Sequence, residues 1–442
     1  MALELTELTR LDVVVGLMKE HGVRTLVFKR LAPNDNSKNQ IYLGGNYSAL
    51  QLLPFGKVYA DESRKDSKRD RFKADLPFFW MNANGGLFPA PSAQLILYPK
   101  YPEVRMSGFL KGAEFAPKGY LTSRAPGRIM LLGITRDRRI IGHVVGADNP
   151  LSRELEVYDS DGVFSTVFQE QTDADTRTQL LDKLREIHEM GWVNSCKLDS
   201  TGNIQPYKAQ NGGGYTLEAL LGVTPNGDNE PDFLGWEIKQ HKARLDNPLS
   251  GGAITLMTPE PTGGIYKESG IVPFIRQFGY PDKSGKPDRF NFGGVHKFGE
   301  RQASTGLTLT LSGYDPDTKK IFDINGGITL QGDSGENAAI WHFSSLLEKW
   351  NRKHAQAAYI PSEKGPGQIP QYRYGHTVAL GSGTDFGKFL SAMAKQSIYY
   401  DPGIKVENLT TTPKAKKRSQ FRIRPPFIPD LYERVETISL CP

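Results

Sequence analysis

The sequence predicts two domains, a β-rich domain over residues 1–168 and an α/β domain over residues 177–442, joined by a linker at 169–176. The length of 442 residues exceeds what one hydrophobic core usually serves. The 46 glycines and 29 prolines favour turn-rich, strand-containing structure. Long helical periodicity starts only after the linker, which separates a strand-and-turn part from a mixed part.

The first domain reads as strand, turn, strand after one short helix. Residues 10–19 have the spacing of an amphipathic helix, and residues 24–30 and 93–98 read as strands. Residues 128–135 and 139–145 are two apolar runs with a tight turn between them, which predicts a hairpin. We therefore expect a β-rich barrel or sandwich here.

The linker Gln169-Glu-Gln-Thr-Asp-Ala-Asp-Thr176 is polar and without apolar periodicity. Directly after it, apolar residues at helical spacing predict a helix that ends at Gly191. Glycine-punctuated strands follow, and residues 343–353 and 385–395 read as helices. Helices that bracket a mixed sheet predict an α/β domain.

Within the second domain, one stretch contains several acidic residues and a lysine that could act together in catalysis. Gly214-Tyr-Thr-Leu-Glu-Ala-Leu-Leu-Gly222 reads as a short helix carrying Glu218, and Pro231-Asp-Phe-Leu-Gly-Trp-Glu-Ile-Lys239 reads as a turn and a strand. Alternation along a strand puts Glu237, Lys239 and His241 on one face. An acidic face is thus expected opposite an apolar one.

This arrangement suits hydrolysis of a phosphodiester. The reaction needs an activated water and positive charge near the phosphorus, and carboxylate-bound Mg²⁺ supplies both. We assign Asp232 and Glu237 as the metal ligands and Lys239 as the group that orients water and stabilises charge. Glu218 is expected to reach the site directly or through a metal-bound water.

The spacing alone is a weak signal. An Asp, four residues, an acid, one residue and a Lys should occur by chance about 0.2 times in such a chain. A solvated edge strand with a salt bridge would carry the same pattern. The preceding helix with its own glutamate, the apolar partner face and the loop Gly212-Gly-Gly214 favour the metal site.

Several separated motifs resemble the MvaI/BcnI group of restriction endonucleases, within the PD-(D/E)XK superfamily. They are the two segments above, Ile254-Thr-Leu-Met-Thr-Pro-Glu-Pro261 and Trp350-Asn-Arg-Lys-His-Ala355. The resemblance covers roughly residues 175–440 and implies Mg²⁺-dependent cleavage of double-stranded DNA by a monomer. It implies metal-binding acids at Asp232 and Glu237, a catalytic lysine at Lys239 and an accessory acid at Glu218. Members of this group read short sites of the CC-N-GG kind.

The first domain carries a second, shorter resemblance. Phe28-Lys-Arg-Leu-Ala-Pro-Asn-Asp35 and Ile41-Tyr-Leu43 are similar to the start of the EcoRII effector domain, a B-three-like DNA-binding pseudobarrel. This implies an effector domain that binds a second DNA copy, with Lys29 and Arg30 as phosphate contacts. A β domain that serves only folding or protein contacts is the alternative.

A basic run near the C-terminus is the main candidate for DNA contact. Residues 413–424 hold six basic residues and no acid. If the run is extended, one face presents Lys416, Arg418, Gln420, Arg422 and Arg424. Arginine and glutamine pair with base edges and lysine mostly with phosphate. A disordered basic tail is the alternative, and His376 is a further candidate for the DNA surface.

Other classes find no support in the sequence. Two cysteines, Cys196 and Cys441, cannot build a disulfide framework or a cysteine-rich zinc site, which fits a reducing cytoplasm. The start lacks the order of a signal peptide, and no run of 18 apolar residues suggests a membrane span. Walker, GxSxG and Cys/His zinc motifs do not occur.

The sequence thus predicts a cytoplasmic, sequence-specific type II restriction endonuclease that uses Mg²⁺ on duplex DNA and binds two copies of its site if the first domain is an effector. A repair or nicking nuclease with the same metal site is one alternative. The other is a non-catalytic DNA-binding protein, which would require loss of a metal acid or the lysine.

Overall fold

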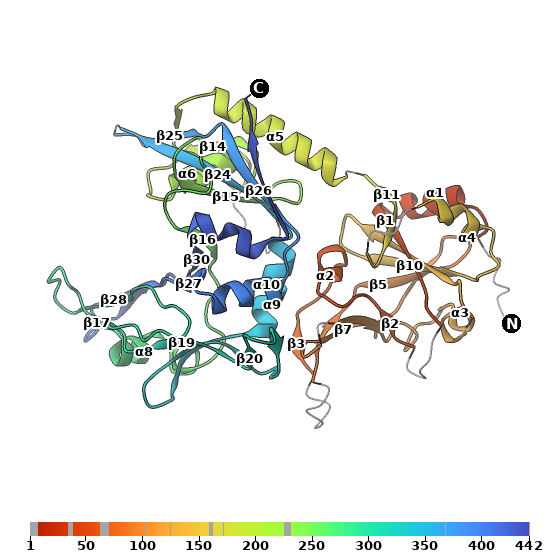
Figure 1. Ribbon diagram of the computed structural model, residues 1–442, viewed down its shortest axis with the longest axis horizontal. Coiled ribbons are helices and arrows are strands. Elements are labelled where there is room, and N and C mark those ends of the chain that lie inside the picture. The colour runs from red at the N-terminus through yellow and green to blue at the C-terminus, as the bar shows by residue number, and fades with distance from the viewer. Residues whose placement is uncertain are drawn as a thin grey trace. The chain divides into compact units, whose positions relative to one another are not determined.

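The computed structural model describes residues 8–33, 39–61, 70–101, 103–123, 125–158, 162–170, 172–224, 231–366 and 368–441. The chain divides into two compact units, Met1–Thr172 and Asp173–Pro442 (Figure 1). Within this described part, every helix falls short of the length and apolarity that crossing a bilayer requires.

The first unit contains two sheets. The six-stranded sheet has the order β11 (Ser165–Gln169), β1 (Val23–Arg30), β9 (Ile129–Thr135), β10 (Ile140–Val145), β5 (Phe78–Met81), β6 (Leu87–Pro89). The five-stranded sheet has the order β2 (Ile41–Tyr42), β8 (Glu103–Ser107), β7 (Gln94–Tyr98), β4 (Phe72–Asp75), β3 (Tyr59–Ala60). The helices are α1 (Leu11–Glu20), α2 (Ala49–Leu52), α3 (Lys118–Thr122), α4 (Leu151–Glu154) and the 3-10 turn η2 (Leu155–Val157).

The core of the first unit explains why its elements form. Leu11, Val14 and Met18 of α1 recur at helical spacing and pack with Leu26 of β1 and Leu131 of β9. The predicted hairpin is confirmed, because β9 and β10 pair antiparallel from Ile129↔Val145 to Ile134↔Ile140. Among the described strands, both sheets are open paths and no closed barrel forms.

The second unit is built on a sheet in which β24 is central. Its order is β12 (Val193–Asn194), β25 (Gln371–Tyr374), β24 (Gln356–Gly365), β26 (Thr377–Ser382), β31 (Arg434–Ser439), and β15 (Glu237–Lys242) pairs parallel with β24. Beside it lie α5 (Asp173–Glu189) and α6 (Gly212–Leu220), as Figure 1 shows. Leu180 and Leu184 of α5 and Leu217 of α6 pack against Ile238 and Val378 of the sheet.

Smaller sheets complete this unit. They are β13 (Cys196–Leu198) with β14 (Ile204–Pro206); β16 (Ile254–Met257), β30 (Phe421–Ile423) and β27 (Ile398–Tyr400); β17 (Tyr280–Pro281), β18 (Arg289–Gly293), β28 (Gly403–Glu407) and β29 (Lys414–Lys416); β19 (Thr308–Ser312), β22 (Gly327–Gln331) and β23 (Asn337–His342); and β20 (Tyr314–Asp315) with β21 (Lys320–Ile321). The remaining helices are α7 (Ile265–Glu268), α8 (Ile271–Phe278), α9 (Phe343–Lys353), α10 (Phe386–Ala394) and the 3-10 segment η3 (Pro425–Leu431). The mixed α/β character predicted for residues 177–442 is confirmed.

The predicted linker at 169–176 is shorter in the structure. Gln169 is the last residue of β11, and α5 begins at Asp173. Ala174 and Asp175, in the first turn of this helix, are exposed. Because solvent-facing residues need not be apolar, the pattern that defines the rest of α5 is missing there, and the expected linker overlaps the first turn of the helix, close to the cap that Asp173 or Asp175 is expected to provide.

A buried histidine in this unit makes its stability dependent on pH. Burial lowers the pKa of His296 to about 4, and the ring contacts the Gly294 carbonyl and the Thr305 hydroxyl. A folded-state pKa below that of the unfolded chain means that stability is present above about pH 6.5 and is lost as the pH falls toward 4. We expect wild type to lose about 2–3 kcal/mol more than His296→Gln between pH 7 and 4.5. Urea unfolding of both proteins measures this, and a difference that stays constant with pH would contradict it.

Candidate active site

A tight turn sets the position of Asp232. Phe233 and Trp236 exchange both backbone hydrogen bonds, at 3.0 and 2.8 Å, around Leu234 and Gly235. Both central residues have positive φ, 47° and 86°, as in the two-residue turns that suit strand twist. A leucine in this region is strained. The turn folds the chain back, so that the Asp232 Oδ2 accepts the Ile238 N–H at 2.9 Å.

The strand that follows separates a polar from an apolar face. Trp236 and Ile238 are buried in the core with α5 and α6. Glu237, only 1 % exposed, accepts a hydrogen bond at Oε1 from Lys239 Nζ, as the alternation along β15 predicts. The acid and the lysine are therefore fixed side by side at the start of the strand.

A second lysine reaches the same carboxylates from a distant segment. Lys353 Nζ, in the last turn of α9, lies 3.5 Å from Asp232 Oδ1 and 3.4 Å from Glu237 Oε2. Burial works against its charged form, but the carboxylates of Glu237 and Asp232 outweigh this and raise the Lys353 pKa. Two acids and two lysines thus form one charged cluster.

Glu218 of α6 adds a third carboxylate to the site. Burial, with the negative charge of Asp232, raises the pKa of Glu218 to about 7, against the opposing effect of Lys239. Burial also raises the pKa of Glu237 to about 7, even though Lys239 favours its ionised form. Burial therefore opposes ionisation of both glutamates, and added positive charge would favour it.

All of these residues except the enclosed Glu237 line one cleft of about 790 Å³. Its wall includes the carboxylates of Glu218 and Asp232 together with Lys239 and Lys353, and it continues past Tyr215, Gln240, Thr255, Lys364 and Arg422. The acids on this wall lie beside Lys239 and Lys353, and the rest of the wall carries basic or hydrogen-bonding groups such as Lys364 and Arg422. Such a cleft can hold a polyanion with one of its phosphates beside the carboxylates.

The donor set fits a small hard cation. Asp232 Oδ1 and Glu237 Oε2 are the carboxylate oxygens left over once Ile238 N and Lys239 Nζ have taken the others, and both face the Lys353 ammonium. In the described residues, no group of three His, Cys, Asp or Glu side chains is arranged to hold a metal. Two carboxylates are nevertheless what Mg²⁺ commonly takes from a protein, since it keeps several waters.

The basic run that the sequence suggests as one strand is divided between two sheets. Lys414–Lys416 forms β29 beside β28, whereas Phe421–Ile423 forms β30 between β16 and β27. The single shared face is therefore not formed, because Ser419 and Gln420 between the two strands are buried. Lys416, Arg418 and Arg424 are exposed, and Arg422 is half-buried.

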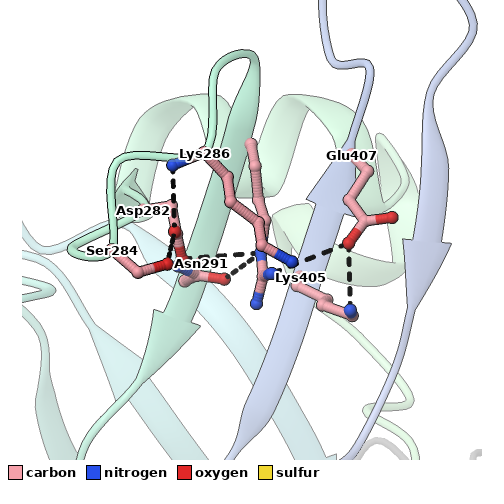
Figure 2. Close-up of polar contacts among 7 residues, drawn as sticks. Asp282, Ser284, Lys286, Asn291, Lys405 and Glu407 are labelled. Atoms are coloured by element: carbon pink, nitrogen blue, oxygen red, sulfur yellow. Dashed lines mark hydrogen bonds and ion pairs between the residues drawn. The ribbon is translucent and has the colours of Figure 1, made fainter.

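Ion pairs within the protein determine which basic side chains near this run remain available to bind a polyanion. Figure 2 shows Lys405 beside Glu407 and a cluster around Asp282, where the side chains of Ser284 and Asn291 and the Lys286 N–H donate to its carboxylate. Arg289 pairs with both Asp282 and Glu407 and so joins the two groups. Arg422 pairs with Asp401 and also donates to the Ala253 carbonyl. Within the described part of the chain, neither Lys416 nor Arg418 forms an ion pair, so these two present their charge to solvent.

The candidate histidines lie in different surroundings. His376 follows β25, with its ring 5.7 Å from that of His188 on α5, and it is not part of the cleft wall. His241 shares the strand with Glu237, but burial lowers its pKa to about 4 and its Nε2 lies 2.8 Å from the Pro248 carbonyl oxygen. His354 is buried and stacks on Trp350. Only His241 therefore reaches the cleft.

In the first unit, Lys29 and Arg30 point to different places. Lys29 lines a pocket of about 350 Å³ together with Gln40, Arg105 and Arg128, whereas Arg30 lies over the Phe28 ring. Among the residues that the structure describes, no Asp or Glu lines this pocket. Asn34 and Asp35, the end of the segment that resembles the EcoRII effector domain, lie outside the described residues.

Lys353 is the site residue to which sequence reasoning gave no role. It stands 121 residues after Asp232, so no local spacing connects them. The sequence does mark the segment that contains Lys353, since Trp350-Asn-Arg-Lys-His-Ala355 is one of the motifs that carry the resemblance. Only the parallel pairing of β15 with β24, directly after α9, brings the lysine to the acids.

Comparisons with known proteins show what the chain is similar to. The model of the MvaI/BcnI restriction endonuclease family matches residues 181–432, more than half of the chain. Among solved structures, a complex of restriction endonuclease MvaI with its cognate DNA substrate is 17% identical, with 61% of this chain and 100% of that chain covered and a TM-score of 0.45. MvaI in the absence of DNA is 15% identical, with 61% and 99% covered and a TM-score of 0.33. No curated protein matches the chain.

Proposed function

The chain belongs to the MvaI/BcnI restriction endonuclease family and is thus a type II site-specific deoxyribonuclease, and we propose that it cuts double-stranded DNA with Mg²⁺ at Asp232 and Glu237. The observation that carries this proposal is the convergence of two carboxylate oxygens, Asp232 Oδ1 and Glu237 Oε2, beside Lys239 in a cleft that can hold a polyanion.

Each residue then has a task in the hydrolysis. A water attacks the phosphorus and loses a proton to solvent, the bond from phosphorus to the leaving oxygen breaks, and that oxygen takes up a proton from solvent. Lys239, fixed by Glu237, orients the water and stabilises the charge that develops on the phosphate. Glu218 accepts a hydrogen bond from the attacking water. A divalent ion at the two acids would lower the pKa of water and offset phosphate charge.

For the DNA surface, we propose Lys416, Arg418 and Arg424 as exposed contacts to the duplex, with Arg422 at the cleft. Arg422 lines the cleft wall directly. Gln420 and His376 belong to the same proposal, although Gln420 would have to become exposed and His376 would contact DNA beyond the cleft. A short site of the CC-N-GG kind, read by a monomer, is the specificity we propose.

For the first unit, we propose an effector module with a B-three-like pseudobarrel that binds a second copy of the site. The pocket that Lys29 lines with Arg105 and Arg128 supports this assignment, because clustered cations attract phosphates. Arg30, next along β1, is proposed as a contact on the neighbouring surface.

Removal of the metal tests the central proposal. We expect purified protein to convert plasmid DNA into discrete fragments in Mg²⁺ and to leave it intact in EDTA, because the two acids alone cannot activate water. Sequencing of the fragment ends would show one short motif. Random ends would contradict site specificity, accumulation of singly nicked circles would favour a nicking nuclease, and fragments formed in EDTA would exclude the metal mechanism.

A further inference from the structure

The Lys353 side chain occupies the position between the two proposed metal ligands. Its ammonium lies 3.5 Å from Asp232 Oδ1 and 3.4 Å from Glu237 Oε2, at nearly equal distance from both acids. Each acid has its second oxygen engaged elsewhere, by Ile238 N–H in one case and by Lys239 in the other. The two oxygens available to a metal are therefore the two that face Lys353.

Charge explains why a cation is needed there. Glu237 is fully buried, Asp232 lies within the same cluster, and Glu218 adds a third carboxylate. Buried carboxylates without counter-charge are costly, and Lys239 supplies only one positive charge. Lys353 supplies a second charge from α9, at the end of a long side chain.

We propose that the Lys353 ammonium holds the place of the divalent ion in the metal-free protein and leaves the two acids when the ion binds. The inference rests on the proposed function, because it takes Asp232 and Glu237 as the metal ligands. An ion bound to both acids takes over the neutralisation that Lys353 provides. Metal binding is thus an exchange of one cation for another, and no covalent bond changes.

The position of Lys353 allows this exchange. Its side chain is 28% exposed and belongs to the cleft wall, whereas Glu237 is enclosed. Four rotatable bonds let the ammonium move into the cleft without a change in α9. Once released, the charge lies where a DNA phosphate would enter.

The test uses Lys353→Met, which keeps the length of the side chain and removes its charge. Lys349→Met, one turn earlier on α9 and outside the cleft wall, is the matched control. Mn²⁺ serves as the probe because it takes the same oxygen ligands as Mg²⁺. Electron paramagnetic resonance measures free Mn²⁺ in the full chain without DNA, and thermal melting is recorded in EDTA and in saturating Mn²⁺.

We expect Lys353→Met to lower Tm in EDTA by about 2–4 °C, to lose this deficit in Mn²⁺, and to bind Mn²⁺ about threefold or more tightly than wild type, because a competitor is gone. Lys349→Met and Lys353→Arg should behave like wild type. Weaker or unchanged Mn²⁺ binding by Lys353→Met, or a Tm deficit equal in both conditions, would overturn the inference alone. Wild type that binds no Mn²⁺ would overturn both it and the metal ligands of the proposed function.

Discussion

Asp232→Asn and Lys239→Met should each reduce plasmid cleavage on the order of a thousandfold while DNA binding persists. Asparagine can still accept the Ile238 N–H, so the turn before β15 keeps its geometry and only the charge of the ligand is lost. Methionine keeps the length of Lys239 and removes the ammonium that contacts Glu237. Both variants should therefore lose a group needed for catalysis while they keep the native fold.

The control for these variants is Lys183→Met on α5, whose partner is the exposed Glu186. Such surface pairs contribute little to stability, so cleavage should stay at the wild-type rate. Rates come from single-turnover assays on a labelled duplex, and binding from gel shift in Ca²⁺. If Asp232→Asn or Lys239→Met cut at the wild-type rate, this cleft would not be the catalytic site.

The second large effect concerns the first unit. We expect a chain lacking residues 1–172 to cut DNA with one site, and to lose the stimulation that a second copy of the site gives to the full chain. The division of contacts at Thr172 supports this boundary, because α5 then stays with the sheet it packs against. An effector acts by binding a second ligand, so its removal should affect only the two-site response.

A point variant separates this result from damage caused by truncation. Lys29→Glu in the full chain reverses a charge in the pocket that Lys29 lines with Arg105 and Arg128, and should reduce stimulation by an added site-containing oligonucleotide about tenfold. Arg30→Glu is the comparison variant, because this side chain lies outside the pocket and over the Phe28 ring on the neighbouring surface. Unchanged cleavage by truncated and full chains, on DNA with one or several sites, would refute the effector proposal.

The parts of the site that the sequence predicts are those held by local structure. Asp232, Glu237 and Lys239 lie within eight residues, and strand alternation alone puts the last two on one face. The basic run shows the limit of this reasoning. Alternation describes an isolated strand, but pairing with β28 and with β16 and β27 divides the run into two pieces and buries Gln420.

Tertiary pairing also decides what the sequence could not reveal. The register of β15 on β24, with Glu237 opposite Ala357, brings the end of α9 to the acids. The sequence of neither segment alone determines that register. The first residues of α5 read as part of the linker for a different reason, since Ala174 and Asp175 face solvent. Local propensity thus predicts elements, while the site depends on how they meet.

The turn between Phe233 and Trp236 also bears on the order of folding. It joins residues close in the chain, so Asp232 and Glu237 can come together at a small cost in loop-closure entropy. Lys353 joins them across 121 residues of sequence, and such distant contacts form slowly. Lys239, two residues from Glu237, is by contrast brought to the acids by β15 itself. The local segment therefore carries its own counter-charge before the distant lysine arrives.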